Sequence, residues 1–217
     1  MQDDHISTVI WARGVQDRLD VRQYRANYHQ WILSDPQREL LRLWGFSAFT
    51  NNCSVSQNDI RLITALVEMW RPETNTFHFP FGELTITLED VYMIMGLHVK
   101  GRPVTHRELD APKAYLQLIQ DLPRIKSYAW GAAVLSYLFR GLTKAAHKST
   151  IALNGCTMLL ILWAHERLLP GAPKITPGVE LVWPMALAWA EPNPDRRENP
   201  HHHTGQYRGD FDRFEMS

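Results

Sequence analysis

The chain has 217 residues, of which 45% are hydrophobic and 21% are charged, a composition typical of one soluble globular domain. Its 23 basic and 23 acidic side chains cancel, so net charge predicts neither a nucleic-acid binder nor a membrane binder. The two cysteines form no disulfide framework, which favours a reducing compartment. The longest apolar run, Ile151 to Ala164, is shorter than the roughly 20 residues of a membrane span, and the acidic start differs from a signal peptide. We therefore expect an intracellular protein without a membrane partner.

The first third of the chain predicts an arm followed by two helices. Residues 1–34 are mixed in character, and we expect an N-terminal arm packed on the body. A helix is expected from Ser34-Asp35-Pro36, because proline early in a helix loses no hydrogen bond. Ser56 and Asp59 mark a second helix start, and that helix continues to Trp70 with apolar residues at helical spacing.

The stretch from Trp70 to Val104 organises the rest of the chain. Pro72 is expected to end the helix that carries Trp70. Residues 76–79 and 84–87 alternate polar and apolar on either side of a Pro/Gly-containing turn, which predicts a β-hairpin over about 76–87. Thr87 and Asp90 resemble a capping box for a helix from Leu88, and Gly96 is expected to end it.

The second half of the chain predicts the core and a loose tail. Residues 126–146 and 149–169 read as two long apolar helices joined by a tight connection, hence antiparallel neighbours that bury Leu160 and Trp163. Shorter helices are expected at 110–122 and from 176 to Pro184, whereas 191–209 reads as a loop or loosely held tail. The predicted fold is mainly α, a single compact helical domain with one small β-hairpin. Its core spans 35–190, between the arm and a C-terminal segment at 191–217.

A family resemblance is carried by WRPETNTFHF at 70–79, GELT at 82–85, LEDV at 88–91 and GRPV at 101–104. With HIS at 5–7, WAHERL at 163–168 and YRGDFD at 207–212, these segments resemble the plant mobile domain family, also labelled "aminotransferase-like". The resemblance covers almost the whole chain, although Phe81 stands where a small residue or cysteine is expected. Its signature residues, read as structural, are Trp70, Arg71, Glu73, Phe77, His78, Gly82, Glu83, Asp90 and Gly96.

The resemblance implies a nuclear plant protein of transposon-related ancestry. Family members, which include maintenance-of-meristems-like proteins, act in transposable-element silencing, gene expression and meristem maintenance. Their protein partners include plant proteins related to serine/threonine phosphatase 7. We expect a non-enzymatic domain without a cofactor, because the sequence offers no phosphate cup of the kind that pyridoxal-phosphate enzymes need.

Motifs of catalysis and metal binding are scarce. The sequence has no Gly-rich phosphate loop, no H-E-x-x-H and no C-x-x-C. Cys53 and Cys156 read as small apolar residues rather than nucleophiles, and the run 201–203 of three histidines reads as a solvated loop rather than a metal site. In the signature, Arg71 is expected to bind a carboxylate, which Glu83, Glu89 or Asp90 could supply.

Basic residues gather where acidic ones are missing. No acidic residue occurs between Asp121 and Glu166, and basic residues at 140, 144 and 148 recur at i, i+4 and i+8. The candidate DNA or partner contacts are Arg124, Lys126, Arg140, Lys144, Lys148, Lys100 and Arg102. A solvated helix end favoured by the macrodipole is the competing interpretation.

Three functions therefore stay open, and each has its own structural mark. An exposed aromatic patch would favour a protein-interaction domain. A contiguous basic surface would favour direct DNA binding, and a deep pocket around Arg71, His78 and a carboxylate would favour an enzyme. The sequence leaves the partner and the oligomeric state open.

Overall fold

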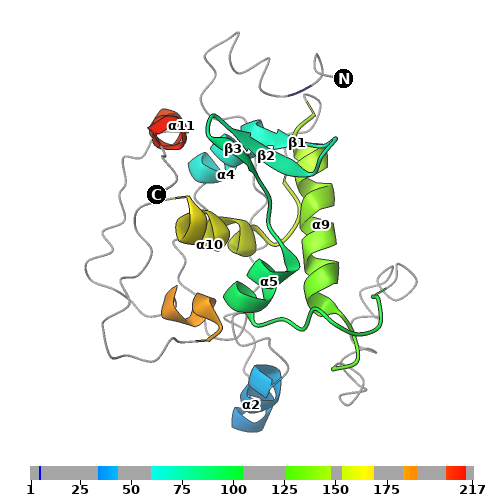
Figure 1. Ribbon diagram of the computed structural model, residues 1–217. Helices are drawn as coiled ribbons and strands as arrows, with labels where there is room; N and C mark the ends of the chain where they lie inside the picture. The colour runs from blue at the N-terminus through cyan, green and yellow to red at the C-terminus, as the bar shows by residue number, and fades with distance from the viewer. Residues whose placement is uncertain are drawn as a thin grey trace.

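The computed structural model describes residues 5, 34–43, 60–104, 126–147, 153–168, 183–189 and 204–213 (Figure 1). The helices of these segments are α2 (Asp35–Leu43), α4 (Ile60–Met69), α5 (Leu88–Met95), α9 (Trp130–Ala145), α10 (Thr157–Arg167), α11 (Thr204–Arg213) and the 3₁₀ helix η3 (Met185–Trp189). The strands are β1 (Trp70–Arg71), β2 (Thr76–Phe79) and β3 (Gly82–Leu84). The described part of the chain is thus mainly helical with a small sheet, as the sequence predicts.

The sheet is a hairpin of β2 and β3 with a two-residue strand, β1, added at one side. A hairpin forms where the sequence predicts one, but its second strand is Gly82–Leu84 and not 84–87. Trp70 belongs to β1 and not to the preceding helix, which ends at Met69. Trp70 pairs with Phe77, and Phe77 pairs with Leu84, so these side chains share the inner face of the sheet. The alternate positions Arg71, His78 and Glu83 therefore share the outer face.

Helix α5 begins and ends where the sequence predicts. The side chain of Thr87 accepts a hydrogen bond from the backbone N–H of Asp90, and Asp90 Oδ2 accepts one from the backbone N–H of Thr87 at 2.9 Å. Gly96 follows the helix with φ 75°, a left-handed conformation that glycine adopts without strain. A Cβ at Gly96 would also lie 3.0 Å from the ring of Pro184, so this glycine lets η3 approach α5 closely.

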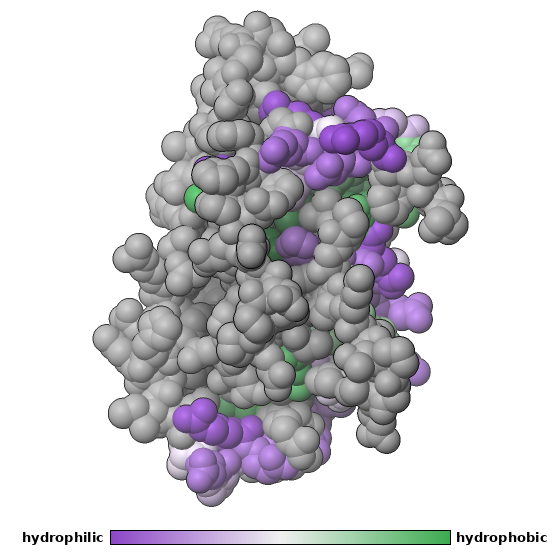
Figure 2. Space-filling model, turned by 90° about the vertical axis from the view of Figure 1, so that its left-hand side faces the viewer, coloured by the Kyte–Doolittle hydropathy of each residue, from purple (hydrophilic) through white to green (hydrophobic). Residues whose placement is uncertain are grey.

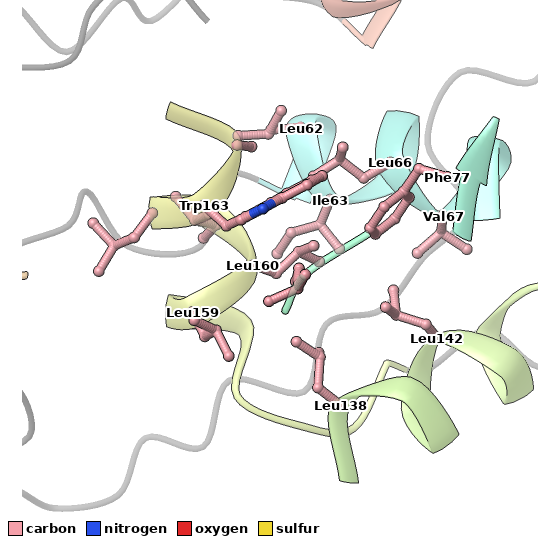
Figure 3. Close-up of a cluster of buried hydrophobic side chains, with 14 of the residues drawn as sticks. Leu62, Ile63, Leu66, Val67, Phe77, Leu138, Leu142, Leu159, Leu160 and Trp163 are labelled. Atoms are coloured by element: carbon pink, nitrogen blue, oxygen red, sulfur yellow. The ribbon is translucent and has the colours of Figure 1, made fainter. Parts of the chain in front are cut away.

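One hydrophobic core joins the inner face of the sheet to α4, α5, α9 and α10. Figure 3 shows Leu62, Ile63 and Leu66 of α4 converging with Trp163 and Leu160 of α10 on Phe77 of the sheet. Trp163 and Leu160 are buried as predicted, with exposed fractions of 1% and 0%.

The predicted packing of the two long helices is wrong. Helix α9 ends at Ala145 and α10 begins only at Thr157, so the connection between them is longer than the tight turn expected. In Figure 1, α5 lies between α9 and α10, and each of these two helices packs against it. Instead, the backbone just before α10 lies directly on α9. The approach is so close that a Cβ at Gly141 would overlap the carbonyl oxygen of Asn154.

The C-terminal segment also differs from the predicted loose tail. Residues 204–213 form α11, which packs against α4 and buries Tyr207 and Phe211 one helical turn apart. On the face shown in Figure 2, hydrophilic side chains gather at the upper right, along the right-hand edge and at the bottom of the molecule. The lowest element in Figure 1, α2, begins at the predicted residue and exposes Asp35, Arg38 and Glu39.

Several expectations lie outside the described residues. They are the N-terminal arm except for His5 and Ser34, Cys53, the helix start at Ser56 and Asp59, the helix at 110–122, the helix from 176 as far as residue 182, and residues 201–203. Within the described segments, no helix is long and apolar enough to cross a membrane.

Candidate interaction surfaces

The signature aromatics are used to build the core. The Trp70 ring lies 4.9 Å from Phe77 and 5.0 Å from Phe139 of α9, measured between centroids. Phe77 in turn stacks on Trp163 of α10 at 5.2 Å. Beside them, Phe81 stacks on Phe79 at 5.1 Å. This aromatic chain ties the sheet to two helices, which supports the structural interpretation of Trp70 and Phe77.

Asp90 joins α5 to the end of α10. Its Oδ2 completes the helix cap, while Oδ1 accepts hydrogen bonds from Arg167 Nη2 at 2.6 Å and Nε at 3.1 Å. The Asp90 side chain is only 5% exposed, whereas that of Arg167 is 57% exposed. The sequence predicted an arginine–carboxylate pair at this place, but the arginine comes from the WAHERL segment and not from Arg71.

Arg71 contacts the N-terminal segment instead of a carboxylate. Its Nη1 donates to the Glu68 carbonyl oxygen at 3.2 Å and lies 3.2 Å from Nε2 of the His5 ring. His5 Nε2 also lies 2.8 Å from the carbonyl oxygen of Trp70, which fits an N–H donor at that atom. Burial is the main cause that lowers the pKa of His5, and the nearby guanidinium of Arg71 acts in the same direction. The cluster holds His5 beside the sheet.

The sequence did not predict the most buried charge pair of the described residues. Arg208 of α11 donates to Glu68 of α4 through Nε at 2.8 Å and Nη2 at 2.7 Å, a bidentate geometry. The Glu68 side chain is 1% exposed, and burial raises its pKa, while the hydrogen bonds and the charge of Arg208 oppose that rise. A signal was present, because Tyr207 and Phe211 mark an apolar face in the segment that carries Arg208.

The outer face of the hairpin carries the signature's remaining polar residues. His78 Nε2 lies 3.4 Å from Glu83 Oε2 and 3.3 Å from Thr74 Oγ1, and Glu83 also accepts from Thr76 at 3.2 Å. The His78 and Glu83 side chains are 36% and 54% exposed, so water reaches both. Glu73 is exposed in the turn between β1 and β2, and Gly82 is exposed at the start of β3. Among the described residues, no group of three or more histidine, cysteine or acidic side chains is placed to hold a metal ion.

One basic cluster lies at the start of α9. The loop 98–102 runs beside 127–131, because Arg102 donates from its backbone to Ser127 and accepts from the backbone N–H of Ala129. The Arg102 guanidinium also stacks over the Tyr128 ring at 5.4 Å. Lys100, Arg102 and Lys126 are all exposed around this point.

The other basic residues lie toward the opposite end of α9. Arg140 and Lys144 are exposed one turn apart, whereas Arg124 and Lys148 lie outside the described residues. From Trp130 to Arg140 the helix rises about 15 Å. The structure therefore separates the two predicted basic clusters along α9 instead of joining them.

A third surface is aromatic and was not predicted residue by residue. Tyr92 of α5 is 41% exposed, and its ring centroid lies 5.2 Å from that of Trp183, which is 46% exposed. Leu88, one turn before Tyr92, is exposed as well. We call Leu88, Tyr92 and Trp183 the α5 patch. The sequence pattern hid it, because helical spacing identifies Leu88 and Tyr92 as apolar without showing which apolar positions stay uncovered.

Comparison with known proteins places this arrangement in a family. The sequence profile of the plant mobile domain matches residues 45–114 and 106–217. Protein MAINTENANCE OF MERISTEMS of Arabidopsis thaliana is 30% identical over 91% of this chain and 55% of its own length. Protein MAIN-LIKE 1 of the same plant is 29% identical over 87% of this chain and 50% of its own length.

A further relative is larger. The Serine/threonine-protein phosphatase 7 long form homolog of Arabidopsis thaliana is 27% identical over 97% of this chain but only 22% of its own length. The chain thus spans about half or less of the curated relatives described here. No solved structure shows significant similarity to it.

Proposed function

Because this chain belongs to the plant mobile domain family, we propose that it is a non-enzymatic interaction domain that works in the nucleus. We infer a role in transposable-element silencing, control of gene expression and meristem maintenance, exerted through protein partners. The similarity to Protein MAINTENANCE OF MERISTEMS supports the link to meristems. The partner class that we propose is a phosphatase 7-like protein.

The α5 patch is the observation that carries this proposal. Single exposed apolar residues are common on monomeric proteins, but two aromatic rings in contact, each exposed by more than two fifths, form a larger apolar surface. Tyrosine and tryptophan are also enriched at the centres of protein interfaces, where a few aromatic anchors supply most of the binding energy. A partner that covers Tyr92 and Trp183 would remove both rings from water.

A non-enzymatic role is supported by how the signature's polar groups are used. Asp90 caps α5 and binds Arg167, and Arg71 donates to the backbone carbonyl oxygen of Glu68 and lies beside His5. The remaining histidine–carboxylate pair, His78 and Glu83, lies on the solvent-exposed outer face of the hairpin. An exposed pair lacks the dry, low-dielectric surroundings in which acid–base and electrostatic catalysis are strongest.

The direct test is a binding titration with the phosphatase 7 long form homolog of Arabidopsis thaliana as the partner. We expect the wild-type chain to bind, and Tyr92→Ala/Trp183→Ala to bind at least tenfold more weakly, since loss of an interface anchor costs about 2 kcal/mol or more. Tyr137→Ala, which removes another exposed aromatic ring, is the matched control and should bind normally. Equal binding by the patch variant would overturn the patch as the interface, and absence of wild-type binding would overturn this partner.

The cellular role needs a separate readout. A fluorescent fusion of the chain should accumulate in the nucleus, and plants that lack the gene should show raised transposable-element transcripts. Wild-type protein should restore silencing, whereas Tyr92→Ala/Trp183→Ala should not. Unchanged transcripts in the mutant plants would contradict the silencing role.

A further inference from the structure

We propose that the exposed side of α9 binds the phosphate backbone of duplex DNA, independently of the α5 patch. The side is formed by Ser136, Tyr137, Arg140, Lys144 and His147, which we call the α9 stripe, and all five are exposed. Spacings of one, three and four residues keep the first four on one side of α9, and His147 follows two residues after the helix ends. The apolar residues between them face the core, because Leu135, Leu138, Leu142 and Ala145 are buried.

Both charged residues of the stripe, Arg140 and Lys144, are basic. Helix α9 contains no acidic residue, and none occurs in the sequence between Asp121 and Glu166. Arg140 and Lys144 are about 6 Å apart along the helix axis. Duplex DNA carries one phosphate charge per roughly 1.7 Å of its axis, so a helix lying against it can set each cation opposite a phosphate. Attraction of this kind releases counterions and reads no base sequence.

The macrodipole alone does not account for the stripe. A cation in the last turn of α9 is favoured by the carbonyl ends, and Lys144 meets that condition. Arg140 lies one turn earlier, outside the last turn in which the dipole acts, so the dipole does not explain its position. Tyr137, which is 57% exposed, lies nearly one turn before Arg140. Its hydroxyl on the same side as Arg140 is one of the groups that donate hydrogen bonds to phosphate oxygens.

Duplex DNA fits this surface better than the other polyanionic partners. Proteins that hold single strands stack successive bases on several aromatic rings, and the α9 stripe offers one, Tyr137. A helix that lies on a membrane must insert its apolar face among lipids, whereas the apolar face of α9 is buried in the core. A-form RNA shares the phosphates, so the experiment must compare it with DNA directly.

The test is binding of a fluorescent duplex of mixed sequence, about 20 base pairs long, measured by anisotropy over a range of salt concentrations. We expect wild-type affinity to fall linearly on a log–log plot with salt. Arg140→Ala/Lys144→Ala should flatten that slope by about 1.8, since each lost phosphate contact contributes about 0.9. At about 50 mM salt the same loss should weaken binding roughly 10- to 200-fold.

The matched control is Arg38→Ala/Arg213→Ala, which removes two exposed positive charges from α2 and α11. The slope of log affinity against log salt concentration should stay within about 0.3 of the wild-type value, because we expect these two charges to make no phosphate contact. Tyr137→Phe should weaken binding modestly without changing the slope, since it removes a hydrogen bond and no charge. All substituted residues are exposed, so thermal melting of the variants should match the wild type and exclude misfolding.

Three results would overturn the proposal. They are no duplex binding by the folded wild-type chain at low salt, equal slopes for the stripe variant and the control, or tighter binding to single strands, duplex RNA or anionic vesicles than to duplex DNA. The protein-interaction proposal can fail separately. Tyr92→Ala/Trp183→Ala should leave DNA binding unchanged, and Arg140→Ala/Lys144→Ala should leave binding of the phosphatase 7-like protein unchanged.

Discussion

Removing Arg208 should destabilise the fold more than any exposed charge change. Arg208 donates two hydrogen bonds, at 2.7 and 2.8 Å, to a Glu68 carboxylate that is 1% exposed. Hydrogen bonds to charged groups are worth about 1.5–3 kcal/mol each, and breaking a buried ion pair by removing one partner costs about 3–5 kcal/mol. We therefore expect Arg208→Ala to lower the free energy of unfolding by about 3–5 kcal/mol at neutral pH. For a chain of this size, the melting temperature should fall by roughly 6–20 °C.

The pH dependence of this loss identifies its cause. Burial raises the pKa of Glu68 in the folded chain, and Arg208 opposes that rise, so the pKa should be higher still in Arg208→Ala. A carboxyl with a raised folded pKa binds its proton more tightly in the folded than in the unfolded state. Its contribution to stability is present below the unfolded pKa and is lost as pH rises through the folded pKa. The difference between wild type and Arg208→Ala should therefore shrink as pH falls from 7.5 toward 5.

Urea unfolding followed by tryptophan fluorescence at these two pH values measures both effects. Arg213→Ala is the control on the same helix, because Arg213 is 78% exposed and pairs with Asp210 three residues earlier. Exposed pairs of this kind contribute about 0.2–1 kcal/mol, so the control should stay within 1 kcal/mol of wild type at both pH values. Equal losses for the two variants, or a loss for Arg208→Ala that does not depend on pH, would refute the buried Glu68–Arg208 pair.

Three further outcomes test the core, the α5 cap and a thiol. Trp163→Ala should cost about 3–5 kcal/mol, because a fully buried aromatic leaves a cavity, and unchanged melting would contradict its place in the core. Thr87→Ala should cost about 1 kcal/mol through the lost helix cap, and Asp90→Ala should cost more because it also releases Arg167; equal values would argue against the ion pair. Burial raises the pKa of Cys156 to about 11, so little thiolate should form in the folded chain at pH 8. In a Cys53→Ser variant, iodoacetamide should therefore label the unfolded chain much faster than the native chain. Similar labelling rates would show that the native thiol is reactive.

Short-range rules predicted the local elements well. The β-hairpin, the capping box of Thr87 and Asp90, and the glycine end of α5 depend on residues within a few positions of one another, and all three are present, with the second strand at 82–84 in place of 84–87. Where the prediction was wrong, the deciding contacts were long-range. The sequence placed α9 and α10 side by side, but α5 inserts between them, and no pattern within either helix shows which neighbour covers it.

The C-terminal segment shows the same limit in its charges. Prolines, histidines and asparagine favoured a loop up to Gly209, although Tyr207 and Phe211 already had helical spacing. Glu68 and Arg208 are 140 positions apart, so no local rule pairs them. The α5 patch was out of reach for a related reason. Whether Tyr92 is exposed depends on which other elements pack over it, and that is a property of the whole fold.

The positions of the two proposed surfaces suggest how one small domain could connect a protein to DNA. Helix α5 packs against α9 through Val91, whose side chain lies 3.1 Å from the position of a Cβ built at Gly131. The α5 patch and the α9 stripe share no residue, and the stripe faces solvent on the side of α9 opposite its buried residues. We therefore expect a partner on the patch to leave Arg140 and Lys144 accessible to DNA. We expect the chain to bind the phosphatase 7-like protein and duplex DNA at the same time, so that a supershifted complex forms with all three components. Competition between the two ligands would place them on a shared surface and contradict this arrangement.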